Sequence, residues 1–520
     1  MDPTTDGRTA GSSDGRADGT DGADGTSGLL TDFRTLVRRL IDEMPAPDGG
    51  PLLVDALTRH LGTEPHQLAV VGFPVPLHRL VDADIALAEV SAVDPDAEVI
   101  GIAGDSRHHM TLGDLVHERH GFGSLVGQVD YDRMPTGPGP DDRRQVVTSG
   151  LRLFHLDGVP VAVRQQGANP QFGRETGAVE VLAVDREVAD ALISRVQELM
   201  DARSVLRGQV LTFGADPYGR GMAGLTFLER PQVAAESVVL PEGVLERVVH
   251  HVIGMGEQRE RLLAHGQHLK RGVLLYGPPG TGKTHTVRHL LSATPGTTAV
   301  LLSGGALMHI HAAAKVARAH QPAIVVLEDC DLVAEDRSIG MGSSPLLFEV
   351  LDALDGLDSD ADVAFVLTTN RVEDLEVALS QRPGRVDLAA EVPLPDADGR
   401  LELLRLYGGH LFGDEAMSAA AARAEGTTAS FAKELVRRAV LAAALADEPP
   451  GDDHLGVALD GLLSDAQRLT RSLLGVQAHG DDAGGPDDGV PVGALGRPGR
   501  ASRSPGWFAY SPSSGSIHPD

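Results

Sequence analysis

The chain has 520 residues, more than one hydrophobic core usually holds, so its length predicts two or three folded units. A formal net charge of −29 argues against a broad phosphate-binding surface and therefore against nucleic acid as the main partner. The sequence has no stretch of the roughly 18 to 20 uncharged apolar residues that span a bilayer, and its one cysteine, Cys330, has no partner for an intrachain disulfide. These features predict a cytoplasmic protein without a membrane segment.

Both ends of the chain are predicted to be disordered. Residues 1–28 repeat Asp and Gly and contain almost nothing to bury, and residues 477–520 are rich in Gly, Pro, Asp and Ser. Order is expected to begin at residue 29, because apolar residues recur at helical spacing from Leu29 to Met44.

Residues 29–231 predict one α+β domain. The turn signal Asp157-Gly158 separates two apolar runs and indicates a hairpin. Asp185 is a candidate N-cap for a helix that places Leu192 and Val196 on one face. Strands are expected at 99–102, 145–147, 151–154, 159–163 and 179–184. We find no catalytic constellation in this domain, which is expected to select a partner.

A phosphate-binding loop follows the apolar run 272–276. Its residues are Gly277, Pro278, Pro279, Gly280, Thr281, Gly282, Lys283 and Thr284, and a helical pattern comes next. The glycines let backbone N–H groups close around phosphate oxygens, and the helix N-terminus adds positive potential. Lys283 is expected to reach the β and γ phosphates of a nucleotide, and the Thr284 hydroxyl to bind Mg²⁺.

A second buried strand, 323–327, ends in the acidic pair Glu328-Asp329. In a parallel sheet this strand end lies beside the phosphate-binding loop. Glu328 is expected to hold the Mg²⁺ shell, and Asp329 to orient the water that attacks the γ-phosphate. The sequence therefore predicts ATP and Mg²⁺ as ligands.

Three later segments make the pattern specific. They are the segment 346–357, which looks like a helix, the segment 363–369, which looks like a strand and is followed by Asn370-Arg371, and Arg382-Pro383-Gly384-Arg385-Val386-Asp387. With the loop and the acidic strand end, they resemble the AAA family proper, the group of the proteasomal ATPases, FtsH and the spastin-like severing enzymes. The resemblance covers roughly residues 238–474.

The resemblance implies a fold, roles and an assembly. The fold is an α/β P-loop core with a parallel sheet, at 235–395, and a small helical lid at 396–476. Asn370 becomes the polar sensor of the γ-phosphate or water, and Arg382 and Arg385 become arginine fingers that complete a neighbouring subunit's site. A homo-oligomeric ring, usually a hexamer, follows. His285 is counted with the phosphate-binding loop among the expected nucleotide contacts.

Two features depart from the family. Its usual order at the metal strand is Asp then Glu, whereas this chain has Glu328 then Asp329, so hydrolysis is expected to be slow if the geometry is not compensated. The substrate-gripping loop expected between Ser303 and Pro322 lacks its aromatic residue. Met308 or Ile310 could line a pore there, and a buried helix end is an equal alternative.

Two functions remain open on the sequence. The first is a Mg-ATP-dependent ring ATPase that remodels an unknown protein partner. The alternative is a nucleotide-gated assembly switch or scaffold that hydrolyses slowly and threads nothing. The sensor and finger residues favour the first, and the short segment after Ser303 favours the second.

Overall fold

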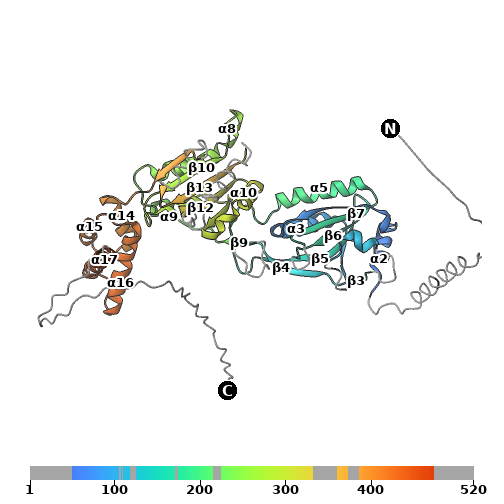
Figure 1. Ribbon diagram of the computed structural model, residues 1–520, viewed down its shortest axis with the longest axis horizontal. Coiled ribbons are helices and arrows are strands. Elements are labelled where there is room, and N and C mark those ends of the chain that lie inside the picture. Colours follow the sequence, from blue (N-terminus) through green and yellow to red (C-terminus); the bar gives the residue numbers. More distant parts are fainter. Residues whose placement is uncertain are drawn as a thin grey trace, which may run out of the picture. The chain divides into compact units, whose positions relative to one another are not determined.

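A computed structural model describes residues 35, 50–104, 107, 109–117, 124–169, 174–214, 224–331, 360–372 and 386–473 (Figure 1). The predicted tails, the predicted helix at 29–44 and the predicted helix at 346–357 lie outside these residues, apart from residue 35. Among the described residues, none of the helices combines the length and the apolar composition that a membrane span requires.

The N-terminal part of the described chain is built on an antiparallel sheet. Its strands are β1 (Val70–Val75), β2 (Glu98–Ile102), β3 (Val126–Gly127), β4 (Asp130–Pro135), β5 (Arg143–Leu156), β6 (Val159–Gln166) and β7 (Gly177–Ala183). The spatial order is β1-β7-β6-β5-β2-β3, and β4 also pairs with β5. Most residues in the later part of β5, in β6 and in β7 are buried, so both faces of this sheet are covered.

The hairpin predicted at Asp157-Gly158 is confirmed. β5 and β6 pair up to Leu156 and Val159, which leaves a two-residue turn. Asp157 has φ 51° and Gly158 has φ 82°, the left-handed values that a type I′ turn requires. The two short strands expected before this turn are one continuous strand, β5.

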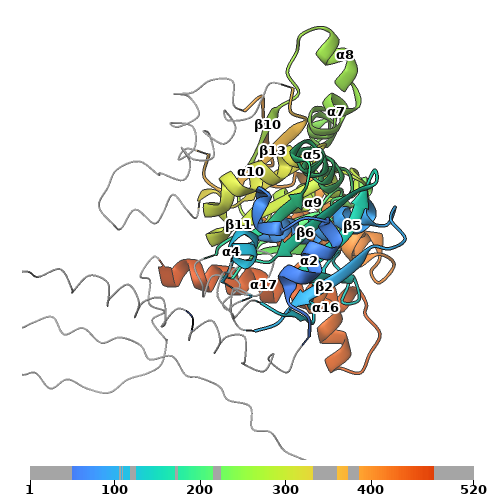
Figure 2. The same cartoon turned by 90° about the vertical axis from the view of Figure 1, so that its right-hand side faces the viewer.

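Helices cover both faces of this sheet. Side chains of α3 (Leu80–Ser91) and α5 (Arg186–Ala202) join one buried cluster, while α2 (Leu53–Leu61) and α4 (Leu112–His117) pack over the other face (Figure 2). The Asp185 side chain accepts a hydrogen bond from the Glu187 N–H, which confirms the predicted N-cap. Single turns of 3₁₀-helix are η1 (Pro65–Gln67) and η2 (Leu77–Arg79).

A second sheet carries the phosphate-binding loop. Its strands are β8 (Val210–Phe213), β9 (Leu225–Leu228), β10 (Arg271–Tyr276), β11 (Thr298–Ser303), β12 (Ala323–Glu328), β13 (Val363–Thr369) and β14 (Leu388–Glu391). The order is β14-β10-β13-β12-β11-β8-β9, and every pairing except that of β8 with β9 is parallel. Strands β10, β12 and β13 are buried on both faces, as their continuous apolar sequences predict.

Two of these strands precede the expected start of the core at residue 235. β8 pairs with β11 in parallel, and β9 pairs with β8. Thr212 also donates its hydroxyl to the Leu301 carbonyl. Hydrogen bonding in the second sheet thus extends back to Val210, inside the range 29–231 that the sequence assigned to the first domain.

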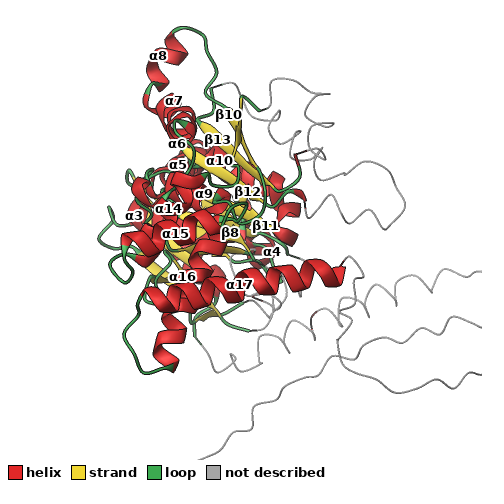
Figure 3. Ribbon diagram, turned by 90° about the vertical axis from the view of Figure 1, so that its left-hand side faces the viewer, coloured by secondary structure: helices red, strands yellow, loops and turns green. Residues whose placement is uncertain are grey.

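Helices flank this sheet and a bundle follows it. The first group is η5 (Ala235–Ser237), α6 (Val244–Val249), the π-helical η6 (His250–Gly254), α7 (Met255–Glu257), α8 (Arg259–Ala264), α9 (Lys283–Ser292), η7 (Gly304–His309) and α10 (Ile310–Ala319). After β14 come α14 (Ala397–Gly408), α15 (Asp414–Arg423), α16 (Ala429–Leu445) and α17 (Asp452–Leu473) (Figure 3). The predicted α/β fold with a parallel core and a helical segment after it is confirmed.

Candidate nucleotide site

The phosphate-binding loop leaves β10 and enters α9 at Lys283. Gly277 has φ 147°, and a Cβ there would run into the Val392 carbonyl. Gly282 precedes the helix with φ 115°, a value that other residues rarely adopt. These glycines let the backbone turn from strand to helix within a few residues, which aims the helix N-terminus at the loop.

The Lys283 side chain is buried and folds back onto the first two residues of the phosphate-binding loop. It is only 6% exposed, and its Nζ donates to the carbonyls of Gly277 and Pro278, each at 2.8 Å. Burial lowers the pKa of Lys283, and the nearby carboxylates of Asp329 and Asp331 oppose that shift. The ammonium is thus held between the loop and two acids, where it can meet a nucleotide phosphate.

The two residues expected to hold the metal meet in the structure. The Thr284 side chain donates a hydrogen bond to Glu328, which lies at the end of β12. Burial raises the pKa of Glu328, Asp329 raises it further, and the Thr284 hydrogen bond counters both. A hydroxyl and a carboxylate are oxygen donors of the type that Mg²⁺ prefers, so these residues fit the ion.

Asp329 and Asn370 lie next to each other across two strands. The Asn370 side-chain amide donates to Asp329 Oδ1 at 3.4 Å. The Asp329 N–H in turn donates to the Thr368 hydroxyl at 3.0 Å. Asp329 has φ 51°, a left-handed conformation that costs on the order of 1 to 3 kcal/mol outside glycine and is concentrated at functional sites.

Asp331 is a site residue that the sequence reasoning missed. Its Oδ1 accepts from the Asn370 N–H at 3.1 Å and from the Thr369 hydroxyl at 3.2 Å, and its Oδ2 accepts from the Asn370 amide at 3.3 Å. Burial acts to raise the pKa of Asp331, but the hydrogen bonds from Asn370 and Thr369 bring it below its ordinary value. Asp331 therefore stays ionised and orients Asn370. The sequence did contain a signal for this residue, because Asp331 is a third acidic residue, two positions after Asp329.

A pocket of about 390 Å³ joins the loop, the acidic strand end and the sensor. Its lining residues are Pro279, Gly280, Gly282, Lys283, Thr284, His285, Arg288, Asp329, Asn370, Tyr407, Ala429, Ser430 and Lys433. The Ser430 N–H donates to the Gly280 carbonyl at 3.1 Å, so α16 contacts the loop directly. α16 lies within 396–476, the range for which the resemblance implied a small helical lid.

Cationic and aromatic residues of this pocket were also missed. Arg288 lies one helical turn after Thr284 on α9, a spacing visible in the sequence. Tyr407 on α14 reaches the pocket from a distant part of the chain, for which the sequence offers no local signal, and Lys433 on α16 reaches it from the segment that begins at Ser430. His285 lies 3.3 Å from the Ser237 hydroxyl, and burial lowers its pKa.

Two further predictions have different outcomes. Arg382 and Arg385, the expected arginine fingers, lie outside the described residues. In the segment expected to hold a gripping loop, η7 places Met308 68% exposed, while Ile310 at the start of α10 is 0% exposed. The alternative of a buried helix end therefore holds for Ile310.

The comparisons with known proteins agree with this geometry. The family model "ATPase family associated with various cellular activities (AAA)" matches residues 273–394. The zinc metalloprotease FtsH of Cutibacterium acnes is 32% identical over 225 residues, 40% of this chain and 31% of its own length. FtsH 1 of Thermomicrobium roseum is 27% identical over 340 residues, 62% of this chain and 50% of its own length.

The 26S proteasome regulatory subunit 10B of Dictyostelium discoideum is 34% identical over 175 residues, which are 31% of this chain and 44% of that protein. The chain thus spans half or less of the length of each of these three relatives. Domains of the matched family hydrolyse ATP and use Mg²⁺ as cofactor. The matched residues hold the phosphate-binding loop, the acidic pair and the sensor strand, so this chain carries an AAA-family ATPase domain.

Proposed function

We propose that the chain assembles into a homo-oligomeric ring, with a hexamer as the expected size, and uses ATP hydrolysis to remodel a protein partner. The observation that carries the proposal is that Lys283, Thr284, Asp329 and Asn370 border a single pocket, although they come from three separate segments. The FtsH and proteasome relatives support a link between such a domain and work on proteins.

The proposal assigns each side chain a task. Lys283 offsets the phosphate charge, while Thr284 and Glu328 hold Mg²⁺, which supplies charge neutralisation during phosphoryl transfer. Asp329 orients and polarises the attacking water. Asn370, kept in place by Asp331, contacts the water or the γ-phosphate.

Completion of the site by a neighbour is the part of the proposal that rests on the sequence alone. Arg382 and Arg385 are proposed to reach the γ-phosphate bound by the adjacent subunit. The N-terminal α+β domain is proposed to select the partner, and a cytoplasmic location is proposed from the composition of the sequence. The domain limits belong to the same proposal, with the start of the ATPase core moved from 235 back to Val210 because β8 and β9 pair within the second sheet; the lid stays at 396–476 and the tails at 1–28 and 477–520.

Steady-state ATPase activity against protein concentration, with and without Mg²⁺, tests the ring. Activity per subunit is expected to rise with concentration and then to level off as rings assemble, and to vanish without Mg²⁺. Sedimentation velocity on the same samples provides the matched control, because the rise in activity must coincide with the larger species. Activity that is constant over the concentration range of assembly would contradict catalysis between subunits.

One observation favours a second function, a nucleotide-gated assembly switch that threads nothing. The segment between β11 and α10 is a 3₁₀ turn of six residues, and its neighbour Ile310 is buried. Of the three large apolar side chains Leu307, Met308 and Ile310, Met308 alone is exposed and could contact a substrate. An assembly that forms with ATP yet leaves every tested partner folded would support the switch.

A further inference from the structure

A second pocket lies in the N-terminal α+β part of the chain, away from the nucleotide-binding residues in sequence. Its volume is about 440 Å³, within the range of small-molecule sites. It is lined by Leu77, Leu80, Arg107, Asp130, Asp132, Met134, Thr148, Ser149, Gln166, Gly167, Ala168, Asn169 and Arg174. Apolar side chains and convergent polar groups of both charges thus border one cavity.

Three polar residues form a row across the sheet at this pocket. Asp130 on β4 is directly opposite Ser149 on β5, and Ser149 is directly opposite Gln166 on β6. Directly opposed residues point to the same face of a sheet, so these side chains are neighbours. The register of β4 and β5 shifts between Asp130 and Tyr131, and such bulges are common beside functional sites because they redirect side chains.

Two buried polar atoms in this row lack partners among the described residues. They are the Ser149 Oγ and the Asp130 Oδ2. Ser149 is 4% exposed and is one of the residues that line the pocket, and its Oγ and the Asp130 Oδ2 are both shielded from solvent. Leaving a buried donor or acceptor unsatisfied costs about 1 to 3 kcal/mol, which a ligand that donates to both atoms would recover.

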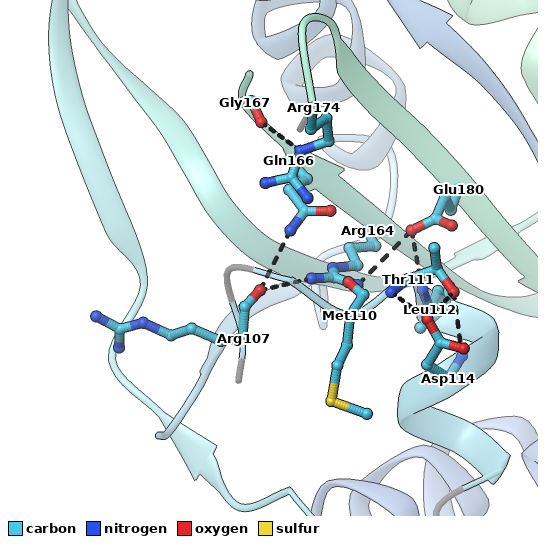
Figure 4. Close-up of polar contacts among 10 residues, drawn as sticks. All are labelled: Arg107, Met110, Thr111, Leu112, Asp114, Arg164, Gln166, Gly167, Arg174 and Glu180. Carbon is cyan, nitrogen blue, oxygen red and sulfur yellow. Dashed lines mark hydrogen bonds and ion pairs between the residues drawn. The ribbon is translucent and has the colours of Figure 1, made fainter. Parts of the chain in front are cut away.

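The Asp130 carboxylate is fixed from its other side. Its Oδ1 pairs with the Arg107 guanidinium at 3.2 Å, which leaves Oδ2 as the remaining acceptor. The segment that carries Arg107 is itself anchored by a buried arginine, Arg164. The Arg164 guanidinium donates to the Arg107 carbonyl at 2.9 Å and to the Met110 carbonyl at 2.5 Å, as Figure 4 shows. Arg107 and Asp130 are therefore held by the fold before any ligand enters.

Arg174 is the second cationic residue that lines the pocket. Its Nε donates to the Gly167 carbonyl at 3.0 Å (Figure 4), and both residues line the pocket. The backbones of Asn169 and Arg174 also form two hydrogen bonds, since the N–H of each residue donates to the carbonyl of the other. Burial lowers the pKa of Arg174, and the nearby Glu180 carboxylate opposes that shift.

We propose that this pocket binds a small zwitterion of the amino-acid or dipeptide class. Asp130 Oδ2 and Ser149 Oγ accept from its ammonium, and Arg174 binds its carboxylate. Leu77, Leu80 and Met134 offer the apolar wall for its side chain. The lining residues carry two arginines and two aspartates, so a ligand with both charges suits the pocket better than a simple anion or cation.

The test is isothermal titration of the full-length protein, without nucleotide, with each proteinogenic L-amino acid and with a set of dipeptides. Binding by the amino acids or by the dipeptides identifies the source of the zwitterion. For the best binder, two analogues remove one charge each: the N-acetyl form lacks the ammonium and the amide lacks the carboxylate. Each analogue is expected to bind at least about tenfold more weakly, the loss typical of one charge-assisted hydrogen bond.

Protein variants then assign each charge to its residue. The Asp130→Asn variant is expected to bind the best binder and its N-acetyl form about equally, and still to bind the amide more weakly. The Arg174→Gln variant is expected to bind the best binder and its amide about equally, and still to bind the N-acetyl form more weakly. Ser149→Ala preserves the backbone and is expected to weaken binding at least about threefold. Arg186→Gln is the matched control, because Arg186 lies on α5 with 77% of its side chain exposed and outside the pocket.

Folding of each variant is checked by circular dichroism and by its melting temperature. The proposal is overturned if no member of the set binds at 10 mM, about the weakest affinity that the titration detects. It is also overturned if folded Asp130→Asn and Arg174→Gln keep both charge preferences. Binding of longer partner segments alone, with no binding of the small zwitterions, would show a protein-docking groove and would likewise overturn it.

Discussion

Asn370 and Asp331 are joined by two hydrogen bonds, one from the Asn370 backbone N–H at 3.1 Å and one from its side-chain amide at 3.3 Å. This pairing orients the amide of the sensor, because both carboxylate oxygens of Asp331 are used. The same amide also donates to Asp329, the proposed water-side carboxylate. Asp331 is thus a positioning residue that links the sensor strand to the acidic strand end.

The first prediction concerns this link. Asp331→Ala should reduce kcat by about tenfold or more while the KM for ATP changes less than twofold, because Asn370 loses its orientation and the phosphate contacts remain. Asp331→Asn is the conservative control and should recover part of the rate, since its amide oxygen still accepts from the Asn370 N–H. Equal loss of kcat and of nucleotide affinity would indicate general structural damage instead.

Lys283→Ala should abolish high-affinity ATP binding, measured by titration with a fluorescent ATP analogue. The substitution removes the one lysine within the phosphate-binding loop, and the remaining backbone N–H groups do not replace its charge. Lys270→Ala is a suitable control, because Lys270 precedes β10 and lies outside the lining of the pocket. Equal affinity in the Lys283 variant and the unaltered protein would contradict the assignment of the loop.

The inverted acidic pair gives the third prediction. Asp329→Asn should keep ATP binding and stop turnover, which traps an ATP-bound assembly that gel filtration can detect. Glu328→Gln should instead raise the Mg²⁺ concentration needed for half-maximal activity, because Thr284 and Glu328 form the proposed metal side. Normal turnover in Asp329→Asn with a dead Glu328→Gln would mean that the two roles are exchanged.

The fourth prediction tests catalysis between subunits. Arg385→Ala should bind ATP normally and hydrolyse it poorly, since an arginine supplied in trans contributes about 10³ to 10⁵ in turnover. Mixed with Asp329→Asn, it should regain activity, because an intact Asp329 from one subunit can meet an intact Arg385 from its neighbour. If mixed assemblies of the same size as the unaltered protein recover no ATPase activity, catalysis between neighbouring subunits is contradicted.

The last prediction separates the two apolar residues of the segment after β11. Met308→Ala should change ATPase activity less than about threefold, because Met308 is 68% exposed and makes little core contact. Ile310→Ala should lower the free energy of unfolding by about 2 to 5 kcal/mol, the cost of truncating a fully buried side chain. Loss of partner remodelling in Met308→Ala with intact ATPase activity would establish a pore role for that residue.

The sequence alone was sufficient for the parts of this protein that follow from local pattern. The phosphate-binding loop, the buried strands β10, β12 and β13, the N-cap Asp185 and the turn Asp157-Gly158 each depend on neighbouring residues and their conformational preferences. The acidic pair could be placed because parallel strands carry their functional residues at the carboxyl edge. Even the resemblance to the AAA family rested on such contiguous segments.

Only the tertiary structure decided which distant residues share a site. Strand β8 joins the second sheet through hydrogen bonds to β11, about ninety residues further along, and short strands carry no sequence signal for their partner. Tyr407 and Lys433 reach the nucleotide pocket because α14 and α16 pack beside the loop. Likewise, Asp130, Ser149 and Gln166 become neighbours through strand register, which is fixed by long-range pairing rather than by the residues around each of them.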